Sequence, residues 1–102
     1  MRKNSKQINN EQAARDLYAT LASLQTTLET REFLEALLTP AERKRLVLRW
    51  RLVRLLAAGM TQRDIAARLK VSLCKITRGS RELKYGPPIF RALAQKNMGQ
   101  SR

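Results

Sequence analysis

Two arginines and a glycine have the residue types and the spacing to hold a small, flat ligand. Gly79 lies three residues after Ile76, where the inward face of a helix would carry another large aliphatic side chain. Arg78 is its neighbour, and Arg49 lies, together with Trp50, on a long preceding helix expected to pass underneath. A gap between guanidinium groups suits an aromatic ring and a carboxylate, through cation–π stacking and forked hydrogen bonds. Close helix packing, with the arginines facing phosphate, accounts for the same residues equally well.

The segment from Thr61 to Ile76 has the pattern of a helix-turn-helix. Ala66 is small enough for a second helix to cross closely over the first, and Ser72 begins that second helix. The apolar plug that fixes the crossing angle consists of Ile65, Leu69, Val71 and Ile76. In DNA-binding proteins of this type, the first residues of the second helix face base edges in the major groove. The pair is expected over about residues 61–84, although such helix pairs also occur as plain structural units.

Residues at the groove-facing ends of this helix pair are the candidates for contacts with DNA bases: Gln62, Arg63, Ser72, Leu73, Cys74 and Lys75. Arginine and glutamine can pair bidentately with guanine and adenine edges. Other residues are better placed for phosphates, which set the register without reading the sequence: Arg68, Lys70, Thr77 and Lys84. Cys74 is interpreted as a small apolar contact.

Charge is distributed unevenly along the chain, whose formal net charge is +13. Residues 1–42 contain five basic and six acidic residues, a balance of −1, whereas residues 43–102 contain sixteen basic and two acidic residues, a balance of +14. This asymmetry indicates a polyanionic partner and coincides with the helix-turn-helix pattern, so we favour double-stranded DNA over a merely solvated basic face. Aromatic residues make up only 5% of the chain, which argues against base stacking as the binding mode.

The composition also excludes several classes of protein. Cys74 is the single cysteine and there is no histidine, which excludes an intramolecular disulfide and the common zinc sites, so no metal is expected. No histidine base, paired-carboxylate cleft or glycine-rich phosphate loop points to an enzyme. No apolar run approaches the ~18 residues needed to span a bilayer, and no signal-peptide core follows the first residues. We expect a soluble, cytoplasmic protein without a membrane partner.

The elements that position these residues are predicted to be helices within one domain over residues 11–96. Residues 1–10 are polar and basic and predict a mobile arm, and residues 97–102 predict a frayed tail. Leucines spaced by four and three residues place an apolar stripe on the first helix: Leu17, Leu21, Leu24 and Leu28. Thr30 is the expected cap of a short second helix that carries Phe33, Leu34, Leu37 and Leu38.

Four further helices are predicted. Thr39-Pro40-Ala41-Glu42 has the capping-box pattern of a helix start, and the helix is expected to end near Ala58, before Gly59. Thr61 and Ser72 are the expected caps of the next two helices, joined by a turn at Lys70-Val71. The second of these runs to about Lys84. A break at residues 85–88 precedes a last helix that carries Ile89, Phe90 and Leu93.

The helix over residues 40–58 is apolar on more than one side, with arginines interleaved among the apolar positions. Such a helix must be covered from several directions, and a chain of 102 residues supplies limited cover. We therefore predict that a second copy of the chain covers it and also uses the leucine stripe of the first helix. Helices of the same chain are the alternative source of that cover.

The run Ile76-Thr77-Arg78-Gly79-Ser80, followed by Leu83-Lys84, resembles the bacterial tryptophan repressor family. The other matching positions are Leu38-Thr39-Pro40, Glu42-Arg43, Arg49 and Thr61-Gln62-Arg63. The resemblance covers about residues 34–85 and is most specific over residues 76–80, whereas the first thirty residues match only in helical character. It implies an all-α fold of six helices per subunit, an intertwined homodimer, and a transcriptional repressor of tryptophan biosynthesis genes in the bacterial cytoplasm.

The resemblance also implies L-tryptophan as corepressor, with no further cofactor. Arg49 and Arg78 would sandwich the indole, Arg78 would also meet the carboxylate, and Gly79 would give the ring room. Thr39 and the backbone near Leu38 of the other subunit would close the site. Binding would set the two reading heads to the spacing of successive major grooves, about 34–36 Å.

For the DNA face, the resemblance implies direct base contacts by Arg63. Thr77 and Lys84 would contact the operator backbone.

Three features depart from the family pattern. Glu82 stands where the family usually has a serine near the ammonium of the ligand, so it either binds that ammonium more strongly or selects a different ligand. The loop Gly59-Met60-Thr61 is one residue shorter than usual. Leu83-Lys84-Tyr85-Gly86 resembles a broader set of tryptophan-repressor-like proteins. A ligand-independent or differently liganded helix-turn-helix protein, such as a repressor-like regulator or a transposase-type module, is therefore the alternative function.

Overall fold

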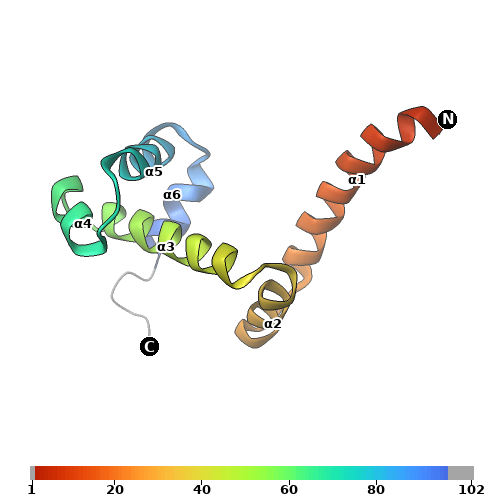
Figure 1. Cartoon of the computed structure of the whole chain (residues 1–102), viewed down its shortest axis with the longest axis horizontal. Coiled ribbons are helices and arrows are strands. Elements are labelled where there is room, and N and C mark those ends of the chain that lie inside the picture. The colour runs from red at the N-terminus through yellow and green to blue at the C-terminus, as the bar shows by residue number, and fades with distance from the viewer. Residues whose placement is uncertain (1, 97–102) are drawn as a thin grey trace. The chain divides into compact units, whose positions relative to one another are not determined.

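The computed structural model describes residues 2–96, with side chains from residue 9 onward, and these residues form six α-helices and no β-strand (Figure 1). The all-α fold and the number of helices predicted from the sequence are thus confirmed. The chain divides into two compact units, Met1–Pro40 and Ala41–Arg102. The buried core draws only on residues from Leu52 onward. The single domain predicted over residues 11–96 stays a prediction. The tail predicted at residues 97–102 lies outside the described residues.

The first unit contains α1 (Arg2–Ser23) and α2 (Thr27–Leu37). Residues 2–10 belong to α1, so the arm predicted there is helical, and its mobility stays a prediction. This segment mixes good helix formers (lysine, arginine and glutamine) with weaker ones (asparagine, serine and isoleucine), so it extends a helix that is nucleated further along the chain. Because α1 ends at Ser23, the predicted leucine stripe is divided between two helices, and Leu28 lies on α2.

The cap of α2 is Thr26, and the prediction of Thr30 as the cap was wrong. The Thr26 hydroxyl accepts a hydrogen bond from the Glu29 amide at 3.0 Å, and the Glu29 carboxylate accepts one from the Gln25 amide at 2.9 Å. A threonine followed three residues later by a glutamate is the capping-box pattern, which fits Thr26 and does not fit Thr30. Thr30 instead lies inside the helix, and its hydroxyl donates to the Thr26 carbonyl at 3.0 Å.

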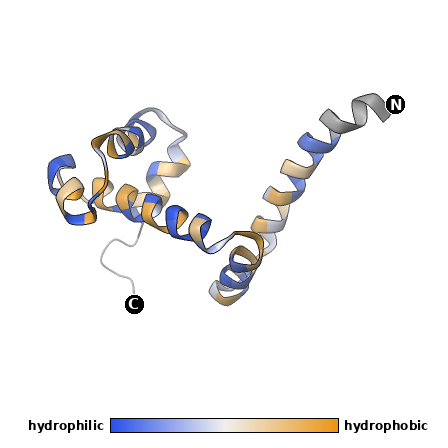
Figure 2. Cartoon of the chain, viewed as in Figure 1, coloured by the Kyte–Doolittle hydropathy of each residue, from blue (hydrophilic) through white to orange (hydrophobic). Residues whose placement is uncertain are grey.

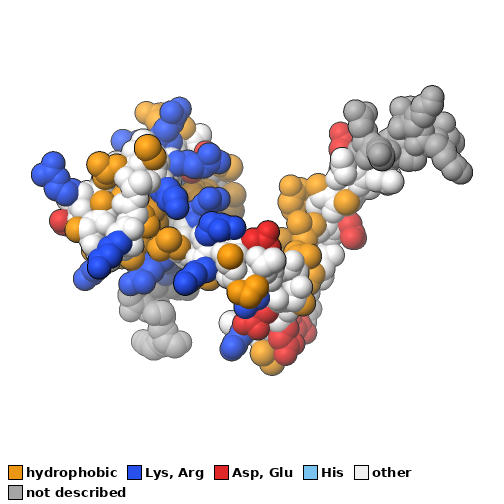
Figure 3. Space-filling view, viewed as in Figure 1, with side chains coloured by type: hydrophobic (Ala, Val, Ile, Leu, Met, Phe, Trp, Pro, Cys, Tyr) orange, Lys and Arg blue, Asp and Glu red, His pale blue; other side chains and the backbone are white. Residues whose placement is uncertain are grey.

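The first unit leaves its large apolar side chains uncovered within this chain. No residue from 9 to 40 is buried. The large apolar side chains of this segment that are exposed are Leu17, Tyr18, Leu21, Leu28 and Leu37. Figure 2 shows hydrophobic positions recurring along α1, and Figure 3 shows their side chains gathered on one side of it. An exposed apolar stripe of this kind is typical of a surface that a partner covers.

The second unit contains α3 (Pro40–Ala57), α4 (Gln62–Leu69), α5 (Leu73–Tyr85) and α6 (Pro88–Gln95). Its fully buried residues come from all four helices and are Leu52, Val53, Ile65, Ile76 and Ala94. The helix boundaries agree with the predicted ones to within one or two residues, and Gly59, with a φ of 101°, follows the end of α3 as expected. No helix among the described residues is long and apolar enough to cross a membrane.

A local hydrogen bond caps the start of each helix in the pair α4–α5. The Thr61 hydroxyl accepts from the Asp64 amide at 3.1 Å, and the Ser72 hydroxyl accepts from the Lys75 amide at 3.4 Å, which confirms both predicted caps. Lys70 adopts the left-handed conformation with φ 56° and ψ 48° and ends α4. A left-handed residue is a common way for a helix to end, although a glycine usually occupies that position.

Replacing Ile65 by alanine is expected to lower the free energy of unfolding by about 2–5 kcal/mol, because the side chain is fully buried and the cavity would not be refilled. Urea denaturation followed by far-ultraviolet circular dichroism, at one protein concentration, measures the change. Leu73→Ala is the matched control: this leucine is 56% exposed, and its loss should change the stability by no more than about 0.5 kcal/mol. Equal losses in the two variants would contradict the assignment of the core.

Candidate functional site

A cavity of about 180 Å³ lies between α3, α5 and α6 in the second unit. Its wall is apolar at Leu46, Trp50, Val53, Gly79 and Phe90, and its charged residues are Arg49, Lys75, Arg78 and Glu82. Cavities of about 150 Å³ in proteins hold a benzene ring, so this one has the size for an aromatic group. Four of the predicted ligand residues are thus brought together.

Leu38 and Thr39, which the resemblance assigns to closing the site from the other subunit, are not among the residues that line this cavity.

Gly79 is buried where α5 crosses α3. A Cβ atom at this position would lie 2.9 Å from Leu52 Cδ2, which is closer than side chains normally pack, and 3.4 Å from Leu56 Cδ1. The glycine therefore permits the close helix crossing that was one of the two interpretations of the sequence. It also lines the cavity, which was the other. The two interpretations are compatible, because the absence of a side chain at Gly79 lets α5 pack closely on α3 and also leaves the adjoining cavity unobstructed.

Two aromatic rings form one wall of the cavity. The ring centroids of Trp50 and Phe90 lie 6.3 Å apart with an interplanar angle of 67°, an edge-to-face contact. The sequence analysis placed Trp50 on the underlying helix and Phe90 on the last helix, but it assigned neither residue to the ligand site. A signal for Trp50 was present, because Leu46, Arg49, Trp50 and Val53 have the i, i+3, i+4, i+7 spacing of one helical face.

The charged residues of the cavity carry opposite signs. Lys75 was predicted to contact DNA bases, yet it lines the cavity together with Arg49 and Arg78. Glu82 is the single carboxylate among the lining residues and follows Arg78 by one helical turn on α5. The cavity therefore offers both cations and an anion around an apolar space, an arrangement complementary to a zwitterion that carries a ring.

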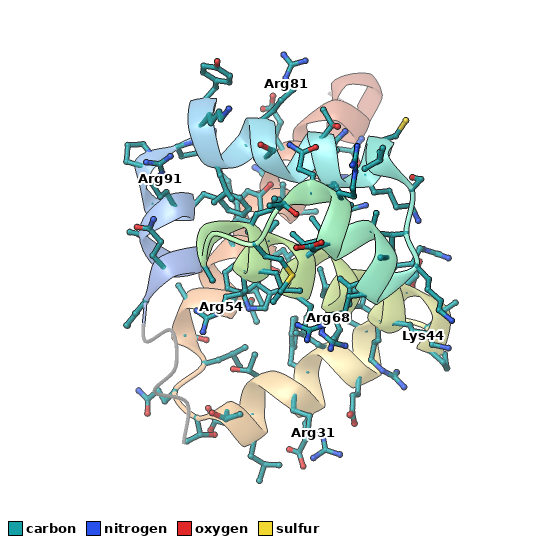
Figure 4. The ribbon with its side chains drawn as sticks, turned by 90° about the vertical axis from the view of Figure 1, so that its left-hand side faces the viewer. Arg31, Lys44, Arg54, Arg68, Arg81 and Arg91 are labelled. Carbon is teal, nitrogen blue, oxygen red and sulfur yellow. The ribbon has the colours of Figure 1, made fainter. Side chains whose placement is uncertain are left out.

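All residues predicted to contact DNA are exposed: Gln62, Arg63, Arg68, Lys70, Ser72, Leu73, Cys74, Lys75, Thr77 and Lys84. A shallow hollow between the start of α4 and the outer face of α5 brings together Gln62, Thr77, Ser80, Arg81, Lys84 and Tyr85. Arg81 extends outward from α5 (Figure 4), and Lys and Arg side chains crowd the visible face of this unit (Figure 3). This hollow has no acidic residue in its wall and is polar, so it suits a phosphate backbone.

Comparison with known proteins agrees with these features. A family model described as Trp repressor protein matches residues 12–98. The chain belongs to the Trp repressor family. The match is longer than the segment 34–85 on which the resemblance was based, so it includes α2 and the second half of α1.

Relatives of this Trp repressor family member carry the name Trp operon repressor homolog. The relative from Chlamydia trachomatis serovar L2 is 36% identical over 95 residues, which cover 88% of this chain and 98% of the relative. The relative from Pasteurella multocida is 40% identical over 70 residues, 68% of this chain and 69% of the relative. That from Actinobacillus succinogenes is 43% identical over 68 residues, 66% and 67% of the two chains.

Arg54 fastens the last helix of this Trp repressor family member to α3. Its guanidinium lies 5.9 Å from the centroid of the Trp50 ring and donates hydrogen bonds to the carbonyls of Leu93 at 3.3 Å, Ala94 at 3.4 Å and Lys96 at 2.8 Å. These carbonyls form the negative end of α6, where a cation is favourable. Arg54 thereby helps to keep Phe90, and with it the aromatic wall of the cavity, in place.

Replacing Arg54 by methionine is expected to lower the free energy of unfolding by about 1–3 kcal/mol, because the α6 carbonyls lose a charged hydrogen-bond donor. The fluorescence of Trp50, the single tryptophan, should also shift to the red as its ring becomes wetter. Urea titration followed by that fluorescence records both effects. Arg51→Met, at an exposed position of the same helix, should leave stability and emission unchanged. If both variants behave alike, Arg54 does not hold α6.

Proposed function

We propose that this protein is a dimeric, DNA-binding transcriptional repressor that takes L-tryptophan as corepressor and controls tryptophan biosynthesis genes. The observation that carries the proposal is the ring-sized cavity beneath α5, in which Arg49, Arg78 and Gly79 converge. The names of the relatives in three bacterial species point in the same direction.

The chemistry of the cavity supports tryptophan as the ligand. The indole would occupy the apolar space next to Trp50 and Phe90, with the guanidinium of Arg49 or Arg78 against its face. Arg78 would bind the carboxylate through a forked pair of hydrogen bonds. Glu82 would accept hydrogen bonds from the ammonium, a role for which a carboxylate is stronger than a hydroxyl group.

The pair α4–α5 is the proposed helix-turn-helix. The start of α5, capped by Ser72, would enter the major groove, with Arg63 and Gln62 at the neighbouring end of α4. Thr77 and Lys84, which share one hollow on α5, would bind operator phosphates. The excess of basic residues after residue 42 would supply the sequence-independent part of the affinity.

Two further properties follow from the proposal. The exposed apolar side chains of α1 and α2, such as Leu17, Leu21 and Leu28, would be covered by a second copy of the chain. A ligand between α3 and α5 would favour one orientation of α5 over others, and would thereby raise the population that matches successive major grooves.

The tight contact of Gly79 with Leu52 favours one alternative, a helix-turn-helix protein that binds no ligand at all. Isothermal titration of the purified protein with L-tryptophan separates the two functions. Saturable binding at one site per subunit, followed by selection of a DNA sequence that is bound only in its presence, is expected. Selection of the same sequence with equal affinity without tryptophan would favour the alternative.

Arg78→Ala is expected to weaken L-tryptophan binding by more than about tenfold, because a charged pair of hydrogen bonds to the carboxylate is lost. Isothermal titration measures the loss. An unchanged affinity would remove Arg78 from the site.

Glu82→Gln tests the ammonium contact separately. L-tryptophan should bind this variant several-fold more weakly, whereas the analogue without the amino group, indole-3-propionate, should bind it at least as well as the original protein. Parallel titrations with the two compounds give the comparison. If both ligands weaken equally, Glu82 does not contact the ammonium.

Arg63→Ala should relax the preference at one base pair by about 1–3 kcal/mol, because a bidentate contact with a base edge is lost. Lys84→Ala should instead weaken all DNA sequences alike. Fluorescence anisotropy with the selected sequence and its single-base variants measures both. A uniform loss in the Arg63 variant would show that this residue contacts the backbone.

A further inference from the structure

A second, smaller hollow lies between α3 and the start of α5. Its volume is about 60 Å³, and the four charged residues in its wall are all cations: Arg45, Arg49, Lys75 and Arg78. Its remaining lining is aliphatic. Three of these cations also line the larger cavity, whereas Arg45 belongs to the hollow alone.

The four cations are not neutralised by the chain itself. Among the described residues none of them forms an ion pair, and Glu82, the one carboxylate of the neighbouring cavity, does not line the hollow. Like charges brought together on two crossing helices repel each other and oppose folding. An anion bound from outside the chain would replace this repulsion by a net attraction and would thereby stabilise the fold.

The size and the shape of the hollow narrow the class of anion. The hollow, at about 60 Å³, has less than half the volume of a cavity of about 150 Å³ that holds a benzene ring, so it suits a small tetrahedral group better than an aromatic ring. Three of the four cations are arginines, whose planar, forked donors match phosphate oxygens bidentately. The hollow also lies at the start of α5, close to the residues proposed to meet DNA.

We propose that this hollow binds a phosphate group, and that Arg45 on α3 extends the DNA contact beyond the helix-turn-helix. The chemistry recognised is that of a phosphate, whether it belongs to a DNA backbone or to a free ion. That the phosphate comes from DNA rests on the proposed function. Arg45 had no role in the sequence analysis, because it lies 16 residues before the helix pair.

Arg45→Ala tests the proposal, with Arg51→Ala as the matched control. Both arginines are exposed on α3, but Arg51 lines neither the hollow nor the cavity. Binding of the selected DNA is measured by anisotropy over a range of salt concentrations in saturating L-tryptophan. Arg45→Ala should lower the affinity for DNA about tenfold. It should also make the slope of log K against log salt less steep by about 1 for each hollow that binds a phosphate, and the control variant should change neither quantity. Circular dichroism checks that both variants fold.

Titration with inorganic phosphate distinguishes the source of the anion. DNA binding with equal salt slopes in the two variants overturns the phosphate hollow and leaves the proposed function standing. Phosphate binding that is lost in Arg45→Ala, in a protein that binds no DNA sequence, supports a free phosphate site and overturns the DNA function. A protein that binds neither DNA nor phosphate overturns both.

Discussion

The crossing of α5 over α3 at Gly79 is the contact on which the rest of the second unit depends, because position 79 leaves no room for a Cβ atom. Leu52 and Leu56 of α3 fill that room and bring the two helices together. With α5 held at this distance, Arg78 lies beside the arginine on the other helix, Arg49, and a ring-sized space opens next to the crossing. One missing side chain thus sets both the helix packing and the shape of the cavity.

Charge is the second constraint, because repulsion among the cations on α3 and α5 works against the close crossing of these two helices. The crossing brings cations from α3 and α5 into a small volume without an internal anion to neutralise them. A protein accepts such repulsion at a cost in stability where an external anion is bound. The larger cavity contains one carboxylate, Glu82, and two aromatic rings that the smaller hollow lacks. A single pair of helices therefore presents two adjoining environments, one suited to an aromatic zwitterion and one to a small anion.

The last helix links the cavity to the rest of the unit. Arg54 joins the face of Trp50 to the carbonyl end of α6, and Trp50 meets Phe90 edge to face. Arg91 adds a second link, since its Nε donates to the Leu83 carbonyl of α5 at 3.3 Å (Figure 4). Together these contacts connect three helices around one space, so that a ligand there would contact elements far apart in the chain.

The sequence by itself determined the helices, their caps in the second unit, and four residues of the cavity. Helix periodicity and the capping residues depend on contacts within one or two turns. The local pattern is therefore sufficient to predict the helices, the caps at Thr61 and Ser72, and the helix end before Gly59. It failed at Thr30, where a second threonine competes with Thr26, and it did not predict that the first helix extends back over residues 2–10.

Beyond the meeting of Arg49 with Arg78 and Gly79, tertiary structure alone decided which residues from distant segments meet. Phe90 joins the cavity and Arg54 caps α6 because the fold returns the end of the chain to α3, some 40 residues earlier. Lys75 lines the cavity and Arg45 shares the smaller hollow with residues of α5 because α3 and α5 cross. Such contacts depend on the angle at which helices cross, and that angle is set by the whole core rather than by any local run of residues.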